Sequence, residues 1–382
     1  MKKINGLLLP LVFWPLFVFA SGIAVAEGDA TKIEFSRVDM LLWGRLLAQK
    51  YGMAQARDLI FEKILTQDSS GGRLEEDFIK ASQDPRFRVA NAIKDLSPEA
   101  RSRTAFLFIN GLGQNEKSLS TLGLRRAIDR LKEQGFEAKF LTISSEAASK
   151  ANGEMLATQL NAELQKFDHV FIVTISKGAH DLIHALTQFK NIFNPSDVDK
   201  IESVISLSGV IRHSALSEWF KTSSRPLATL MRRVVAHPRF GALKPDGILS
   251  LAEEPNFVDG LTLLQKPNWI QFVAFPQSND GYPRASFLEN LILRSMRRAG
   301  IRFGPYDGLV ESAASIFPPG LEVRQSIIRT YGPHGAIQGF FRDGRKVVKA
   351  MHSKKFEDKI TAADELMERC MRVLTLVGRK PA

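Results

Sequence analysis

Cysteine is nearly absent from this sequence, in which Cys370 is the only one among 382 residues. A single cysteine forms no disulfide within the chain and excludes zinc sites built from four cysteines. It also excludes a cysteine nucleophile, unless Cys370 itself has that role. Neither a Walker loop nor a G-x-G-x-x-G fingerprint is present, so no nucleotide cofactor is implied. We therefore expect no cofactor.

The composition is that of an ordinary globular protein, with 44% hydrophobic and 24% charged residues. These proportions exclude a disordered tail, a collagen-like rod and a protein with many membrane spans. The net charge of +11 indicates a basic surface, which favours anionic partners such as a phospholipid membrane or a cell-wall polymer. No nucleic-acid-binding module is visible, so we expect no nucleic-acid partner. The sequence leaves the oligomeric state open.

The first 26 residues have the pattern of a secretory signal peptide. Two lysines precede an apolar run over residues 7–20, and small residues then lead to Ala24-Val25-Ala26, an A-x-A cleavage signal. An uncleaved anchor is the alternative, because the stretch approaches the roughly 20 residues that span a bilayer. Pro10 and Pro15 favour cleavage. We expect an exported protein in the periplasm, with secretion or membrane anchoring as the alternatives.

Two patterns divide the rest of the chain, with a boundary expected near residue 103. Residues 27–103 are predicted to be helical, because apolar residues recur there at helical spacing. In residues 104–382, short apolar runs alternate with helical patterns, which is typical of β-α-β units around a parallel sheet. Strands are predicted at 105–109, 138–143, 169–175, 201–207, 269–275 and 321–328, and helices at 123–133, 153–166, 179–189, 286–298 and 361–376. Residues 210–266 interrupt the alternation with helical fragments and prolines.

A serine follows the strand predicted at 169–175, in the run Thr174-Ile175-Ser176-Lys177-Gly178. On a tight turn between strand and helix, a serine hydroxyl is exposed above the sheet if small residues stand two positions before and after it. Gly178 supplies the second position, whereas Thr174 stands where glycine is usual. The backbone N–H of Lys177 then lies at a helix N-terminus, where it can bind an oxyanion. The alternative is an ordinary turn that caps the helix.

A glycine-rich loop, Asn110-Gly111-Leu112-Gly113, directly follows the strand predicted at 105–109. Glycines there allow backbone N–H groups to face a reacting oxygen, although ordinary turns use glycine as well. In an open parallel sheet, functional groups collect at the carboxyl ends of the strands. The loop and Ser176 are therefore predicted to contribute to one site.

Asp307 and His334 stand in glycine- and proline-containing loops near the last strands. His334 lies in Gly332-Pro333-His334-Gly335, just past the last predicted strand. Such a histidine can take the proton of a serine hydroxyl, while a carboxylate orients its imidazole. Asp307 is the candidate carboxylate, and Asp280 is an alternative that lies nearer to its strand.

With these pieces in place, residues 104 to about 340 resemble the α/β-hydrolase fold in its lipase and esterase branch, in which the triad follows the order Ser, Asp, His along the chain. The resemblance implies a mostly parallel sheet flanked by helices, with residues 210–266 as an inserted helical cap. It assigns the nucleophile to Ser176, the acid to Asp307, the base to His334, backbone oxyanion donors to Leu112 and Lys177, and supporting positions to Asn110, Gly111, Gly113 and Gly178.

The expected function is that of an exported serine hydrolase that cleaves carboxylic esters, lipid-like ones above all, through an acyl-enzyme. The alternative is a non-catalytic protein on the same scaffold that binds a lipid, a glycan or another protein. Thr174 and the unusual helical segment 27–103 favour that alternative.

The run His180-Asp181-Leu182-Ile183-His184 resembles H-E-x-x-H, in which two histidines on one helix face bind zinc. Aspartate replaces glutamate here, however, and the sequence offers no convincing third ligand. A metal-dependent hydrolase is therefore a weaker alternative, and we expect no metal site.

Overall fold

The computed structural model describes residues 39–83, 96–112, 122–144, 146–224, 226–235, 245–274, 294–299, 301, 304–307 and 310–330. The described residues all belong to one compact unit. No helix within these ranges is long and apolar enough to span a membrane. Several predicted features lie outside the described residues: the signal peptide, Gly113, Asp280, His334, most of the helix at 286–298 and the helix at 361–376.

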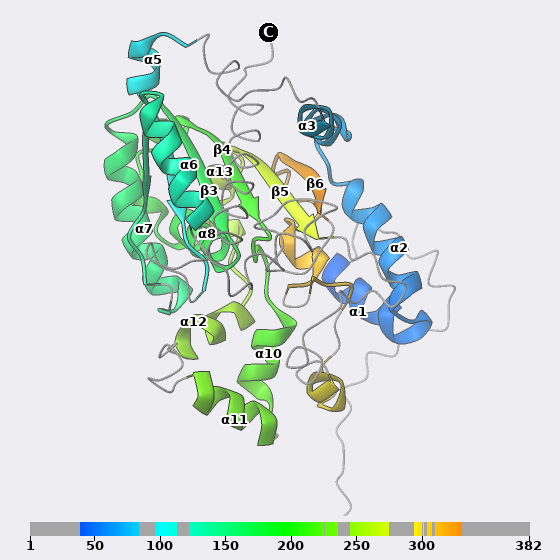
Figure 1. Cartoon of the computed structure of the whole chain (residues 1–382). Coiled ribbons are helices and arrows are strands. Elements are labelled where there is room, and N and C mark those ends of the chain that lie inside the picture. The colour runs from blue at the N-terminus through cyan, green and yellow to red at the C-terminus, as the bar shows by residue number, and fades with distance from the viewer. Residues whose placement is uncertain are drawn as a thin grey trace, which may run out of the picture. The chain divides into compact units, whose positions relative to one another are not determined.

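Among the described residues, six strands form one sheet in the order β2-β1-β3-β4-β5-β6, and all neighbouring pairs are parallel. Figure 1 shows β3, β4, β5 and β6 in this order. The strands are β1 (Thr104–Ile109), β2 (Glu137–Phe140), β3 (His169–Ile175), β4 (Ile201–Leu207), β5 (Asn268–Ala274) and β6 (Gln325–Thr330). Except for β2, they are buried along nearly their whole length. Their continuous apolar runs are explained by this burial, because helices cover both faces.

The helices on the two faces follow different strands. α6 (Leu122–Glu133), which follows β1, packs on one face through apolar side chains that include Leu124 and Leu131. α7 (Ser149–Leu164) and α8 (Lys177–Gln188) pack on the opposite face. The predicted α/β fold with a parallel sheet flanked by helices is thus confirmed.

The order of the strands reverses once, between β1 and β3. From β1 the chain first adds β2 on one side, then crosses back and adds β3 to β6 on the other. The helices after β1 and β3 therefore leave toward opposite faces. At such a switch point the connections diverge, and a crevice opens outside the carboxyl ends of the two strands.

The segment before the sheet is helical wherever the structure describes it. It contains α1 (Met40–Tyr51), α2 (Met53–Leu65), α3 (Arg73–Gln83) and α5 (Pro98–Ser102). Asp39 begins α1, since its side chain accepts hydrogen bonds from the N–H groups of Leu41 and Leu42. Phe78 of α3 packs edge-on against Phe272 of β5, with 5.7 Å between the ring centroids. The segment therefore packs on the β5–β6 side of the sheet.

The insertion between β4 and β5 is also helical, with α10 (Ala215–Thr222), α11 (Pro226–Val235) and α12 (Pro245–Leu249). These helices share a small apolar cluster that includes Trp219 and Ile248, and that also contains Tyr306 and contacts Leu112. α13 (Leu261–Leu264) does not belong to this cluster, because its apolar side chains are buried with those of α8. The predicted range of 210–266 thus contributes helices to two different apolar clusters.

Some element boundaries differ from the predicted ones. α7 begins at Ser149 rather than 153, and β2 ends at Phe140 rather than 143. The last strand begins at Gln325 rather than 321. Gly320 and Glu322 have φ values of 87° and 53°. These left-handed conformations turn the chain and delay extended pairing until Gln325.

Candidate active site

Ser176 occupies the turn between β3 and α8, in a strained backbone conformation. Its φ of 49° and ψ of −117° lie outside the regions that a residue with a side chain readily adopts. Strain of this kind persists only where the surroundings impose it, and it concentrates at functional sites. The serine is half-buried and stands where the first backbone N–H groups of α8 lack partners within the helix. The predicted turn from strand to helix is present.

The chain that leaves β4 holds this turn in place. Ser176 donates its N–H to Leu207 O at 3.1 Å, and Val210 donates its N–H to Ser176 O at 3.0 Å. Ser208, between these anchors, also has a positive φ of 45°. The backbone of Ser176 is therefore hydrogen-bonded to a second strained turn, at Ser208 after β4.

Gly178 brings the start of α8 against the loop after β1. A Cβ atom at this position would lie 2.7 Å from Asn110 O and 2.8 Å from Ile109 O. Both oxygens belong to the backbone, so only glycine allows this approach. Asn110 and Gly111 are buried and Leu112 is half-buried. The structure therefore brings the predicted oxyanion loop and the Ser176 turn together at the switch point of the sheet.

The side chain of Lys177 points into the protein. Its Nζ lies 2.6 Å and 2.7 Å from the two carboxylate oxygens of Asp181, and Asn152 of α7 donates to the same carboxylate at 2.8 Å. Burial lowers the pKa of Lys177 and raises the pKa of Asp181, while their mutual attraction opposes both shifts. The ammonium of Lys177 is thus bound by Asp181, and the role of its backbone N–H as an oxyanion donor stays a prediction.

Thr174, at the position where glycine is usual, is fully buried on β3. It lies beside Ser206 of β4, which in turn lies beside Gln271 of β5. All three side chains are buried, and their polar atoms have no hydrogen-bond partner in the part of the chain that the structure describes. Thr174 is therefore accommodated beside the small side chain of Ser206. Its cost is a buried hydroxyl without a hydrogen-bond partner in the described structure, and the turn at Ser176 still forms.

Asp307 is 1% exposed, in a tight loop that begins at Gly304. It donates its N–H to Val310 O, and its Oδ1 accepts the N–H of Val310 at 2.8 Å. Ser312 ties the loop to the carboxyl end of β5, because its Oγ donates to Ala274 O at 2.6 Å. Although Asp307 is far from β5 in sequence, its loop thus lies at the carboxyl edge of the sheet, where Ser176 also lies.

Residues 210–212 join the turn at Ser176 to the loop that carries Asp307, which is called the acid loop below. Ile211 and Arg212 donate their N–H groups to Ala314 O at 2.9 Å and 3.1 Å, one residue after Val210 binds Ser176. The structure describes β6 up to Thr330, and His334 comes four residues later in the sequence. His334 itself lies outside the described residues, as do Gly113 and the alternative acid Asp280.

The two histidines of the run resembling H-E-x-x-H are buried on α8, with 4.9 Å between their ring centroids. Burial lowers the pKa of His180 well below its usual range, and the positive charges of His184 and Lys177 act in the same direction. Asp181, the base of that motif, is bound instead by Lys177 and Asn152. Within the described ranges, no three His, Cys, Asp or Glu residues are placed to hold a metal ion.

Sequence reasoning missed two groups near the site. Ser208 gave no signal beyond a serine and a glycine after a strand. Arg45 and Glu311, which form an ion pair between α1 and the loop that carries Asp307, are 266 residues apart in sequence. No local pattern connects such residues, whereas the spacing of four between Lys177 and Asp181 is visible on any helix.

Comparisons with known proteins give structural neighbours only. No family model matches the chain, and no curated protein matches it significantly. Among solved structures, a metagenomic carboxyl esterase is 18% identical, over 71% of this chain and 75% of that chain, with a TM-score of 0.44. The mature form of a Bacillus licheniformis lipase is 18% identical, over 65% of this chain and 91% of that chain, with a TM-score of 0.39.

A third neighbour is a phospholipase from Legionella pneumophila, 12% identical over 69% of this chain and 63% of that chain, with a TM-score of 0.36. The neighbours of this chain are thus esterases and lipases. The assignment of the fold rests on this chain's own strand order and on its helices on both faces of the sheet.

Proposed function

We propose that this protein is a serine hydrolase of carboxylic esters, with Ser176 as its nucleophile. The observation that carries the proposal is the strained turn at Ser176, placed between β3 and α8 at the switch point of the sheet. A nucleophilic serine requires this strand–turn–helix context, with its neighbouring N–H groups free to bind an oxyanion.

In the proposed reaction, Ser176 Oγ attacks the carbonyl carbon of the ester while His334 takes the hydroxyl proton. Asp307 orients the imidazole and stabilises its charged form. The N–H groups of Leu112 and Lys177 stabilise the negative oxygen of the tetrahedral intermediate. His334 then gives the proton to the leaving alcohol, and water releases the acyl group from Ser176 by the same steps.

The proposed substrates are lipid-like esters. Support comes from the apolar cluster of the inserted helices, which contacts Leu112 on the oxyanion side and contains Tyr306, next to Asp307. An acyl chain bound at the switch point would meet Leu112, which is half-buried beside this cluster. Such contacts favour long chains, since each buried methylene contributes roughly 0.8 kcal/mol.

The proposal is tested by labelling the purified protein with a fluorophosphonate probe and mapping the labelled peptide. We expect an adduct on Ser176 that is lost in Ser176→Ala and strongly reduced in His334→Ala. Turnover of p-nitrophenyl esters should fall on the order of 10⁴-fold or more in Ser176→Ala. Ser208→Ala is the matched control, because Ser208 is the other strained serine beside the site, and it should keep the label.

A folded protein that takes no label and hydrolyses no ester would contradict the proposal. That result would favour a non-catalytic protein that binds a lipid, a glycan or another protein on this scaffold. Full ester turnover in Ser176→Ala would place the chemistry on another residue.

We also propose that residues 1–26 export the protein and that its basic surface contacts an anionic membrane or cell wall. Removal of Lys2 and Lys3 with the signal peptide lowers the net charge from +11 to +9, and this remaining positive charge supports the second part. Cell fractionation with N-terminal sequencing should find a periplasmic chain that begins at Glu27. A cytoplasmic chain that keeps Met1 would contradict export, and equal sedimentation with neutral and anionic vesicles would contradict the contact.

A further inference from the structure

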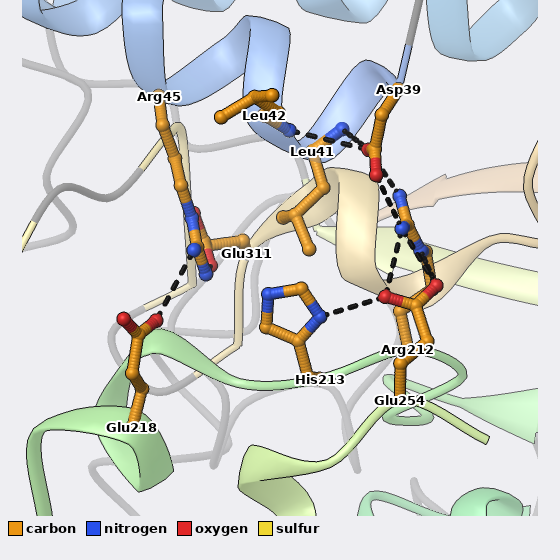
Figure 2. A network of polar contacts seen from close by, with 9 residues as sticks. All are labelled: Asp39, Leu41, Leu42, Arg45, Arg212, His213, Glu218, Glu254 and Glu311. Carbon is orange, nitrogen blue, oxygen red and sulfur yellow. Dashed lines mark hydrogen bonds and ion pairs between the residues drawn. The ribbon is translucent and has the colours of Figure 1, made fainter. Parts of the chain in front are cut away.

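The N-terminal helix α1 is bound to the loop that carries Asp307. Figure 2 shows Arg45 reaching from α1 to Glu311, between α10 and the acid loop. Arg45 Nε lies 3.0 Å from one carboxylate oxygen of Glu311, and Arg45 Nη2 lies 2.7 Å from the other. The two side chains are 11% and 3% exposed. A paired contact of this kind fixes the carboxylate in direction as well as in position.

Glu311 in turn closes the loop around Asp307. Its Oε1 also accepts the N–H of Gly304 at 2.7 Å, and its backbone pairs with Tyr306 in an antiparallel bridge. The start and the end of the loop are thus held by one carboxylate, with Asp307 between them. Because Glu311 is buried, an uncompensated charge there would force the loop to rearrange toward water.

Close backbone packing adds to this support. A Cβ atom on Gly304 would lie 3.2 Å from the carbonyl carbon of Gly44, so α1 lies directly on the start of the loop. α1 is also held at its first turn, where Arg212 Nη2 lies 2.6 Å from Asp39 Oδ2 (Figure 2). Arg212 belongs to the segment that binds the acid loop through Ala314 O. α1, the acid loop and the segment that follows β4 are therefore bound to one another.

We propose that Arg45 is a positioning residue, which acts through Glu311 to set the carboxylate of Asp307 for catalysis. The helical segment before the sheet is then part of the catalytic support. This inference rests on the proposed function, because it requires Asp307 to orient the catalytic histidine. Catalytic groups must be held within fractions of an ångström by the residues that surround them.

The test compares Arg45→Met, Glu311→Gln and Arg57→Met in the full chain. Arg57 is the matched control, since it stands on α2 in the same helical segment and pairs with Asp58, whose side chain is 71% exposed. We expect kcat to fall about 10- to 100-fold in Arg45→Met and Glu311→Gln, because a displacement near 1 Å has effects of this size. KM should change little, and Arg57→Met should match the parent protein.

The pH profile separates positioning from mere stability. A carboxylate beside an imidazole raises its pKa, so a displaced Asp307 should lower the pKa of the catalytic histidine. The acidic limb of kcat/KM should therefore shift to lower pH in Arg45→Met. In an Asp307→Asn background, Arg45→Met should give no further loss, since Arg45 acts through Asp307.

Several outcomes would overturn the inference. One is a folded Arg45→Met with unchanged kcat, and another is an equal loss in the parent and Asp307→Asn backgrounds. If Arg45→Met does not fold, Arg45→Lys replaces it, because lysine keeps the charge without the two-point contact. An unchanged kcat in Arg45→Lys would count against the inference as well. Activity retained in Ser176→Ala would instead overturn the proposed function itself, so the two failures are distinguishable.

Discussion

Lys177 and Asp181 form a buried ion pair in the first turn of α8, with side chains that are 0% and 1% exposed. The pair lies directly after the strained serine, and Asn152 links it to α7 by donating both to Asp181 and to Ser144 O. The first turn of the helix that carries the proposed oxyanion donor is therefore anchored from within. Asp181, which the sequence placed in a run resembling a metal-binding motif, thus fixes the start of α8 through Lys177 and Asn152.

We expect Asp181→Leu to destabilise the protein by about 3–5 kcal/mol, because it leaves the ammonium of Lys177 buried without its partner. The double variant Lys177→Met/Asp181→Leu should recover most of this loss, since no buried charge remains. Urea unfolding measures both. Lys80→Met is the control, because Lys80 and Glu76 have the same spacing but are 73% and 70% exposed, and it should change stability by less than about 1 kcal/mol. Equal losses in the single and double variants would contradict the expectation.

The contact between Asp39 and Arg212 predicts a dependence of stability on pH. Burial alone raises the pKa of Asp39, but the hydrogen bonds and charge of Arg212, with the N–H groups of Leu42 and Leu41, outweigh it and lower the pKa from 3.8 to about 2. A lowered pKa contributes stability that is present above pH 3.8 and is lost as the pH falls through about 2.

Asp39→Asn keeps the cap of α1 but removes the charge. It should therefore lower stability at pH 7, by no more than roughly 1 kcal/mol because the carboxylate is partly exposed and screened by water. The difference from the parent protein should shrink as the pH falls from 4 toward 2. Urea unfolding at several pH values measures it, and a difference that stays constant down to the lowest pH would show that the charge has no role.

Gly178→Ala should impair catalysis more than stability. The added Cβ meets two backbone oxygens, so α8 and the loop at Asn110 must separate. We expect kcat to fall about 100-fold, with a loss of about 1–3 kcal/mol in stability. Gly135→Ala, after α6, is the control. Its φ of 88° strains an alanine backbone, but the added Cβ would have no atom within 4 Å. It should lose stability and keep kcat, and the same kcat in both variants would refute the role of Gly178.

Thr174→Val should leave stability unchanged or raise it by about 1 kcal/mol, because it removes a buried hydroxyl that has no partner in the described structure. Thr187→Val provides the contrast. Thr187 is equally buried, but its hydroxyl donates to Ile183 O at 2.8 Å, so its loss should cost roughly 1 kcal/mol. Thermal unfolding compares the two. A clear loss in Thr174→Val would indicate that a partner, such as a buried water, satisfies the hydroxyl.

Features that depend on residues close together in sequence were predicted better than features that depend on distant residues. β3 and β4 have the predicted bounds, because an unbroken apolar run in a strand covered on both faces needs no further information. β6 was predicted four residues too early, since the left-handed turn at Glu322 depends on its surroundings. Ser176 and Gly178 were identified from a local pattern whose steric reason is now explicit. The catalytic roles predicted for Ser176, Asp307 and His334, and the oxyanion roles of Leu112 and Lys177, remain predictions.

The sequence by itself determined the alternation of strands and helices, and with it the parallel sheet and the turn at Ser176. These features depend on apolar periodicity and on the steric demands of residues adjacent in the chain. The tertiary structure alone decided which distant groups meet: Arg45 with Glu311, Asp39 with Arg212, and Val210 with the carbonyl of Ser176. Such contacts are set by how whole layers pack, and the residues that form them bear no local mark of their partners.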